Sequence, residues 1–189
     1  AQERSLKVNY VMDDEKGTAL KAPYTEATSY DAAYDLTEQI PAEIVYDEDG
    51  QTYVLDSIKG EVQGTVKENV EITAVYSLDA NEDGTPDKYE ATVTYQVVNG
   101  TFEGEENTTV SQTYVLAEQN TDGTWTAKDK TLSDIPVPKA NEGYEGGSWT
   151  PTEPTEETKV EDGAKYTYTF VAQERSLKVN YVMDDEKGT

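Results

Sequence analysis

The sequence contains no cysteine and no histidine among its 189 residues. Without cysteine there are no disulfide bonds, no thiolate metal sites and no thiol nucleophile. Without histidine the chain also lacks the side chain that most often serves as a general base near neutral pH. No nucleophile motif compensates for these absences, so the sequence predicts that this chain is not an enzyme.

Basic residues are few as well. Fifteen Lys and Arg stand against thirty-nine Asp and Glu, for a formal net charge of -24. Such a surface repels phosphate backbones and anionic lipid, so we expect neither nucleic acid nor membrane partners. No run approaches the ~20 apolar residues of a membrane span. No secretory signal opens the sequence, so an exported protein would carry its signal and anchor outside this fragment.

Aromatic and β-branched residues are well represented. The sequence has fourteen tyrosines and two tryptophans, with Val and Ile spread along its length. A chain of this charge with few aromatic residues would be disordered, but this composition is typical of folded β-sheet. We expect most tyrosines to lie in cores or cross-strand pairs, and Trp125 and Trp149 to anchor a core or a loop.

The first eighteen residues, AQERSLKVNYVMDDEKGT, recur without change as residues 172–189. The period is therefore 171 residues, far longer than the 20 to 50 of a solenoid repeat. Identity at eighteen varied positions exceeds what a shared fold demands of a sequence. The duplication predicts a tandem array, with each unit large enough for its own core, as in a fibre or stalk.

The first half of the period reads as β-strands. Ser5–Met12 alternates apolar and polar residues, and so does Val70–Tyr76, which is the period of a half-buried strand. The segments around Ile44–Tyr46 and Tyr53–Leu55 flank an Asp-Gly turn and predict a hairpin. Tyr30–Leu36 fits either a strand or a short helix, with the strand favoured. The segment before it, around Pro23, reads as an extended connection.

The second half of the period also reads as β-strands joined by turns. A strand is predicted around Ala91–Val97, and a closing strand at Lys165–Phe170. Val110–Leu116 and Thr124–Ala127 bracket an Asn-Thr-Asp-Gly turn, which indicates another hairpin. Leu132–Ile135 predicts a single helical turn, because prolines follow it directly.

These residues carry a family resemblance. The first half, with LKVNYVMDDEKGT and VEITAVYSLD, resembles the mucin-binding-protein (MucBP) type repeats of Gram-positive surface proteins. The second half, with VTYQVVNGTF, NEGYEGGSWTPTEPT and YTYTF, is similar to the Listeria–Bacteroides repeat of adhesins. The resemblance implies a mainly β fold of two small β-grasp-like domains in tandem with little helix, export to the cell surface and a place in an adhesin stalk. No ligand-binding residue carries over.

The predicted organisation has four parts. Residues 1–78 form the MucBP-like domain, residues 79–90 an acidic linker, residues 89–171 the second domain, and residues 172–189 the first strand of the next repeat.

The linker DANEDGTPDKYE fits the calcium-loop pattern D-x-[DN]-x-[DN]-G-x₅-E at every specified place. Calcium takes six to eight oxygen ligands, and the sequence offers side chains, a carbonyl and a closing carboxylate in the expected order. The candidate ligands are Asp79, Asn81, Asp83, Thr85 through its carbonyl, Asp87 and Glu90. The alternative is a solvated acidic linker, because Asp, Asn and Gly favour turns for their own backbone reasons. With Ca²⁺ bound, the loop would stiffen the chain.

Two roles remain open for the trailing copy of the first strand. It either begins the next unit of a continuous array, or it inserts into an identical chain and builds a head-to-tail filament. The partners expected are therefore neighbouring repeats or identical chains. A second function, of another class, is an adhesive module that recognises host glycan or protein. An exposed aromatic cluster would favour the adhesive module, and an acidic surface poor in aromatic residues would favour the spacer.

Overall fold

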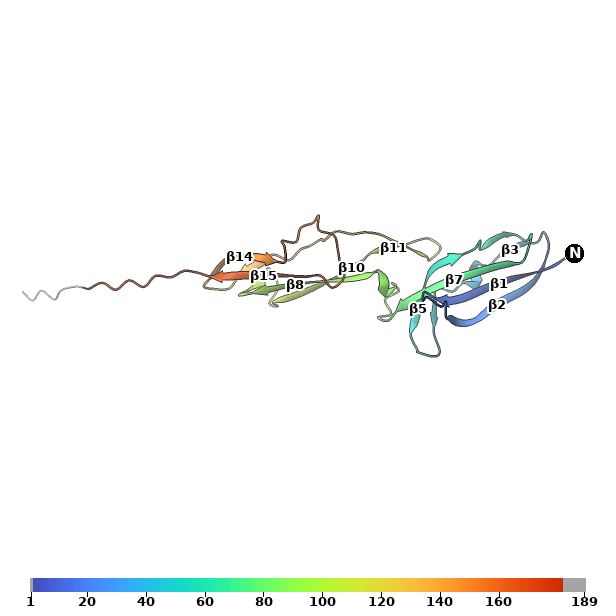
Figure 1. The fold of residues 1–189 in the computed structure, drawn as a ribbon, viewed down its shortest axis with the longest axis horizontal. Coiled ribbons are helices and arrows are strands. Elements are labelled where there is room, and N and C mark those ends of the chain that lie inside the picture. The colour runs from blue at the N-terminus through green and yellow to red at the C-terminus, as the bar shows by residue number, and fades with distance from the viewer. Residues whose placement is uncertain (1, 182–189) are drawn as a thin grey trace, which may run out of the picture. The chain divides into compact units, whose positions relative to one another are not determined.

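The computed structural model describes residues 2–181, and the protein is mainly β with very little helix (Figure 1). The strands of the first half are β1 (Glu3–Met12), β2 (Ala19–Ser29), β3 (Ala33–Asp35), β4 (Glu43–Val45), β5 (Thr52–Lys59), β6 (Gln63–Thr65) and β7 (Val70–Asp79). Those of the second half are β8 (Glu90–Val98), β9 (Gly100–Phe102), β10 (Thr109–Val115), β11 (Ala117–Gln119), β12 (Trp125–Ala127), β13 (Pro138–Ala140), β14 (Tyr144–Thr150) and β15 (Lys165–Ala172). The two short 3-10 helices are η1 (Thr37–Gln39) and η2 (Asp87–Tyr89).

The chain forms two compact units that interleave along the sequence. One comprises residues 1–93, 111–133 and 155–164, and the other comprises residues 94–110, 134–154 and 165 onward. The predicted division into residues 1–78, 79–90, 89–171 and 172–189 stays a prediction.

A five-stranded sheet in the order β2-β1-β7-β5-β4 organises the first unit. Its two central strands, β1 and β7, are parallel, although 57 residues of chain separate the end of one from the start of the other. The flanking pairs, β1 with β2 and β5 with β7, are antiparallel. The first strand, β1, thus lies beside the last strand, β7, with β2 outside β1 and with β5 and β4 outside β7. This is the mixed sheet of a β-grasp fold. The expected fold class is therefore confirmed.

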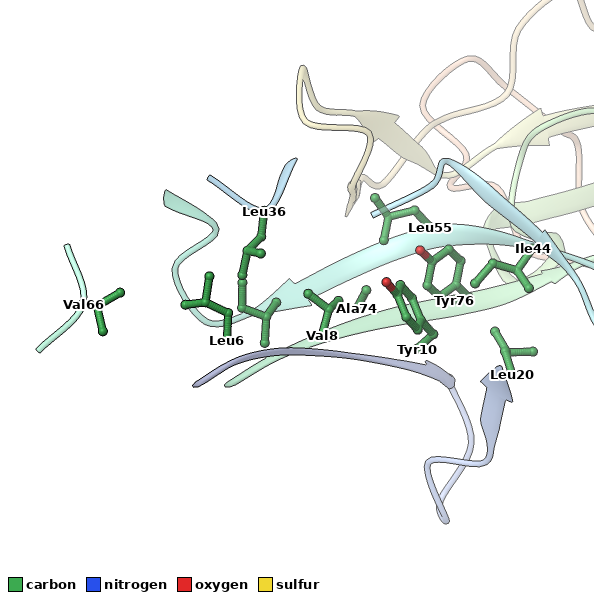
Figure 2. Packing of buried hydrophobic residues seen from close by; sticks show 11 residues of the cluster. Leu6, Val8, Tyr10, Leu20, Leu36, Ile44, Leu55, Val66, Ala74 and Tyr76 are labelled. Carbon is green, nitrogen blue, oxygen red and sulfur yellow. The ribbon is translucent and has the colours of Figure 1, made fainter. Parts of the chain in front are cut away.

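Alternation along β1 builds the core of this sheet, as Figure 2 shows. Leu6, Val8 and Tyr10 are 4%, 0% and 3% exposed, while the residues between them face outward. Tyr76 on β7 is fully buried, and its hydroxyl donates to the carbonyl of Pro41 at 2.9 Å. Its hydroxyl thus has the acceptor that a buried polar group needs, and the tyrosines of this sheet serve the core as predicted.

The second sheet has the order β10-β8-β15-β14, with β8 and β15 parallel at its centre. The first and last strands of the second half are thus neighbours, as in the first sheet. The Tyr95 ring lies 5.8 Å from that of Tyr166 and 6.4 Å from that of Trp149. Aromatic side chains therefore contribute to the core of this sheet, as Tyr10 and Tyr76 do in the first sheet.

Several local predictions need correction. The chain around Pro23 is a strand, β2, and Pro is tolerated there because β2 lies at the edge of its sheet. Only Ala33–Asp35 of the ambiguous Tyr30–Leu36 segment is a strand. The turn at residues 120–123 joins the short strands β11 and β12, while β10 belongs to the second sheet.

The predicted helical turn at Leu132–Ile135 is wrong. The N–H of Leu132 donates to the carbonyl of Thr158 at 2.9 Å, and the carbonyl of Ser133 accepts the Tyr114 hydroxyl. These hydrogen bonds run to distant partners, and Asp134 has a φ of 51°, outside the right-handed helical region, so the chain bends there without a helical turn.

The trailing copy of the first strand is only partly covered. Residues 173–181 have no regular secondary structure, and the end of the predicted strand, from residue 182, lies outside the described residues. No helix of the described part of the chain has the length and apolar character of a membrane span.

Candidate calcium loop and ion cluster

The acidic loop begins where β7 ends and stops where β8 begins. Asp79 is the last residue of β7, Glu90 is the first of β8, and η2 (Asp87–Tyr89) lies directly before Glu90. The first and last candidate ligands are therefore fixed by strands, and the others lie on the connection between them.

Asp79 holds the loop together from its buried end. Its side chain is 1% exposed, and its two carboxylate oxygens accept the N–H groups of Asp83 at 3.2 Å and of Gly84 at 2.8 Å. Gly84 has a φ of 89°, which lets the chain turn back toward Asp79 at little steric cost. The loop is thus curled around its first acidic residue.

Asn81, Asp83 and Glu90 come together on the outer side of the loop. The Asn81 amide donates to Glu90 at 2.9 Å and to Asp83 at 3.3 Å. The N–H of Thr85 donates to Asp83 and lowers the pKa of that carboxyl. Burial and the charge of Asp83 raise the pKa of Glu90. A cation between these two carboxylates would relieve their repulsion.

The remaining candidates are less well directed. Asp87 accepts the N–H of Ala80 at 3.1 Å, so its carboxylate faces the start of the loop. In the described part of the chain no three acidic side chains are already arranged as a metal site. The donor set nevertheless suits a hard cation, because every predicted ligand offers oxygen. The calcium site and its six residues stay a prediction.

Lys88 forms an ion cluster that the sequence pattern did not reveal. Its ammonium lies 2.6 Å from Asp13 and 2.7 Å from Asp56, whose side chain is only 7% exposed. The hydroxyl of Tyr89 donates to the other oxygen of Asp56 at 2.9 Å. Asp13 follows β1 and Asp56 lies on β5, so these contacts fasten η2 to the first sheet.

Electrostatics in the cluster favour the charged forms. The hydrogen bond from Lys88 lowers the pKa of Asp13. Burial would lower the pKa of Lys88, but hydrogen bonds to Asp13 and Asp56 outweigh burial and raise it well above its usual value. Two signals in the sequence point to the cluster: Lys88 is the one basic residue of the acidic loop, and Asp56 interrupts the apolar run of its strand.

The cluster continues into an aromatic contact. The rings of Tyr89 and Trp125 are tilted by 32° with centroids 6.2 Å apart. Trp125 lines a recess together with Asp83, Gly84 and Thr85 of the acidic loop. Trp125 is thus the anchor predicted from the sequence, and its fluorescence will report on the loop beside it.

Comparisons with known proteins give matches only at the level of solved structures. No family model and no curated protein matches this sequence. The chain is similar to domains 3–4 of the Streptococcal High Identity Repeats in Tandem (SHIRT) of a cell surface protein, at 12% identity over 90% of this chain and 99% of that one, with a TM-score of 0.30.

It is also similar to the type 2 repeat of the mucus binding protein MUB from Lactobacillus reuteri, at 17% identity over 90% of this chain and all of that one, with a TM-score of 0.29. Mub-RV gives 17% identity, the same coverages and a TM-score of 0.26. TM-scores this low carry no argument about role. The resemblance to MucBP and Listeria–Bacteroides repeats therefore stays an interpretation of the sequence.

Proposed function

We propose that this chain is a repeat unit of an extracellular stalk that projects a distal tip from a Gram-positive cell surface. The observation that carries the proposal is the unchanged return of residues 1–18 after 171 positions. A tandem array of units with their own cores yields length, and length is what a stalk requires. The cell-surface location rests on the resemblance to Gram-positive surface repeats.

The first sheet is suited to tension. Because β1 and β7 are parallel, the chain enters at one end of the sheet and leaves at the other. A pull along the chain therefore slides β1 past β7 and loads their ladder in shear, over seven registered pairs from Leu6–Val70 to Met12–Tyr76. Shear resists more strongly than peeling, because all the hydrogen bonds must yield together rather than one after another.

The second sheet has the same arrangement on a smaller scale. The strands β8 and β15 share five registered pairs, from Thr94–Lys165 to Val98–Thr169. The chain thus passes from a last strand to a first strand at residues 79–90, and each half carries load through its central parallel pair. We expect the second sheet to yield at the lower force.

The surface favours a spacer over an adhesive module. The formal net charge is -24, and Tyr30 and Tyr181 are the exposed aromatic side chains of the described residues. Sugar-binding platforms need clustered exposed rings, which this part of the chain does not offer. The acidic surface also keeps neighbouring stalks apart.

The test of the stalk role is force spectroscopy on the chain held by its two ends. The proposal expects two abrupt unfolding steps, one for each central parallel pair. A smooth extension with no resolved step would overturn it, because a chain that yields gradually bears no load.

We further propose that Ca²⁺ binds the loop from Asp79 to Glu90 and stiffens it. What supports this is the spacing of the six oxygen donors and the repulsion between Asp83 and Glu90, which a cation would offset. A single ion that holds several side chains of the loop at once restricts their conformations, so the connection that the loop forms becomes more rigid.

Calcium titration followed by calorimetry and by Trp125 fluorescence tests this part, in a Trp149→Phe background so that one indole reports. Glu90→Gln removes a charge and keeps the shape, and we expect it to weaken binding at least tenfold. Asp47→Asn, in another exposed acidic turn, is the matched control. No saturable heat in the parent chain would leave the loop an acidic linker and would not affect the stalk role.

A further inference from the structure

The same residues occupy two different environments in this chain. Leu6, Val8 and Tyr10 of β1 are 4%, 0% and 3% exposed. Their counterparts one period later, Leu177, Val179 and Tyr181, are 101%, 69% and 93% exposed. In the first copy the strand lies between β2 and β7, and in the described part of the second copy no strand flanks it. The second copy thus exposes a core-forming face that fits the slot between these two strands.

The residue before this face is bonded differently in the two copies. The N–H of Gln173 donates to the carbonyl of Gly143 at 2.9 Å, directly beyond the last pair of the antiparallel strands β14 and β15. The carbonyl of Gln2, its counterpart, accepts the N–H of Tyr30 at 3.0 Å, at the end of β2. In a tandem array, this glutamine would therefore be hydrogen-bonded through its N–H to the repeat before it and through its carbonyl to the repeat after it.

We propose that Gln173 is the whole connection between one repeat and the next, clamped on both sides by these two hydrogen bonds. The partner is a second copy of residues 19–79, whose β2 and β7 receive the strand that starts at Glu174. β15 ends at Ala172, and β1 begins at Glu3, the counterpart of Glu174. A single residue then separates two sheet strands. This inference rests on the proposed role as a unit of a tandem array.

Such a junction has little freedom. A connection of one residue has two soft backbone dihedrals, and both of its peptide groups are engaged. Flexible linkers gain their reach from many free residues. This junction therefore holds successive repeats at a nearly fixed angle, whereas the acidic loop of residues 79–90 provides the longer connection inside each repeat.

Side chains on both sides suit this contact. Val171 is 56% exposed, although it lies on the closing strand, and Tyr30 is 47% exposed beside Gln2. Two residues of extended chain span about 7 Å, which brings Val171 within reach of the Tyr30 ring of the next repeat. The buried Nε of Arg4 has no hydrogen-bond partner, while the guanidinium of Arg175, its counterpart, lies beside Gly143. In an array, Arg4 of each repeat would therefore lie beside Gly143 of the repeat before it.

The test uses a two-repeat chain, residues 1–171 followed by residues 1–189, with spin labels on both sides of the junction. The absence of cysteine allows Ser148→Cys in the first repeat and Thr25→Cys in the second, both at exposed positions. The probe is the distance distribution between the labels. Insertion of Gly-Gly-Ser after Gln173 lengthens the junction, and the same insertion after Gly104, in an exposed turn, is the matched control.

We expect a narrow distribution in the parent chain, at least a twofold broadening with the junction insertion, and no change with the control. A parent distribution as broad as that of the junction insertion overturns the clamp. Hydrogen exchange at Leu177 and Val179 separates this outcome from failure of the array itself. If these amides are protected and the distribution is broad, only the clamp fails; if they exchange as freely as in the 189-residue chain, the tandem array fails as well.

Discussion

Replacement of Lys88 by methionine removes the cation of the ion cluster and keeps most of its side-chain volume. Lys88 bridges Asp13 and Asp56, at 2.6 and 2.7 Å. In Lys88→Met, Asp56 remains buried at 7% exposure, with the hydroxyl of Tyr89 as its remaining donor. The variant therefore tests whether the cluster stabilises the first unit.

The expected loss of stability follows from how far the side chains of the cluster are exposed to solvent. Removal of one partner of a buried ion pair costs about 3 to 5 kcal/mol, because a buried charge is left uncompensated. Lys88 is 38% exposed and Asp13 is 45% exposed, so solvent screens that side of the cluster. Exposed pairs contribute only about 0 to 1 kcal/mol. We therefore expect Lys88→Met to lower the free energy of unfolding by roughly 2 to 3 kcal/mol at pH 7.

The pH dependence carries a distinct signature. The pKa of Asp13 is lowered in the folded state, so its contribution is present above its unfolded pKa and is lost as the pH falls through the folded value. The pKa of Lys88 is raised, so its contribution is present below its unfolded pKa and is lost at strongly alkaline pH. The stability difference between parent and Lys88→Met should therefore shrink below about pH 4, where the carboxylates become protonated.

Urea unfolding followed by Trp125 fluorescence measures this difference, again in a Trp149→Phe background. Lys128→Met is the matched control, because Lys128 pairs with Glu118 at 3.1 Å with both side chains about half or more exposed. We expect that control to lose less than about 0.5 kcal/mol. The reasoning is refuted if Lys88→Met loses no more than Lys128→Met, or if its deficit does not shrink as the pH falls from 7 to well below about 4.

Two further predictions concern the core of the first sheet. Ile72→Ala should cost about 2 to 5 kcal/mol by denaturant unfolding, because Ile72 is fully buried; Val45→Ala, at a site 59% exposed, should stay within about 0.5 kcal/mol. Burial raises the pKa of Tyr53 to about 12, and it raises that of Tyr76 further. Stability should accordingly hold below about pH 10 and fall as the pH rises toward the folded values. Absorbance titration of the tyrosines checks this, and a single ionisation step near pH 10 for every tyrosine would contradict it.

Local pattern in the sequence predicted those strands whose two faces differ. Ser5–Met12 alternates because one face is buried and the other is not, and the Asp-Gly turn of residues 47–50 sets the hairpin of β4 and β5. The edge strand β2 was not predicted, because most of its residues are exposed and its sequence does not alternate between apolar and polar residues. The helical turn at Leu132–Ile135 failed because its partner, Thr158, lies 26 positions away.

The parallel neighbours β1 and β7 show a second limit. Val8 lies opposite Ile72, which is 64 positions further along the chain. The local sequence pattern around either residue does not indicate which strand it pairs with. The candidate calcium ligands were predicted from spacing, which is local. The contacts of Lys88 were not, because Asp13 and Asp56 lie 75 and 32 positions away from it in the sequence. Periodicity identifies strands and turns, but pairing between distant segments depends on the whole fold.

The most direct test of the role under tension compares two directions of pull on the first sheet of the full chain. Attachment through Glu3→Cys and Ala80→Cys applies shear to β1 and β7, because these sites lie at opposite ends of the parallel pair. Attachment through Glu3→Cys and Glu68→Cys, which lie at the same end, peels the two strands apart. At one loading rate, we expect the unfolding force in shear to be several times that in peeling. Equal forces in the two directions would contradict the claim that the central parallel strands make this chain a tension-bearing unit.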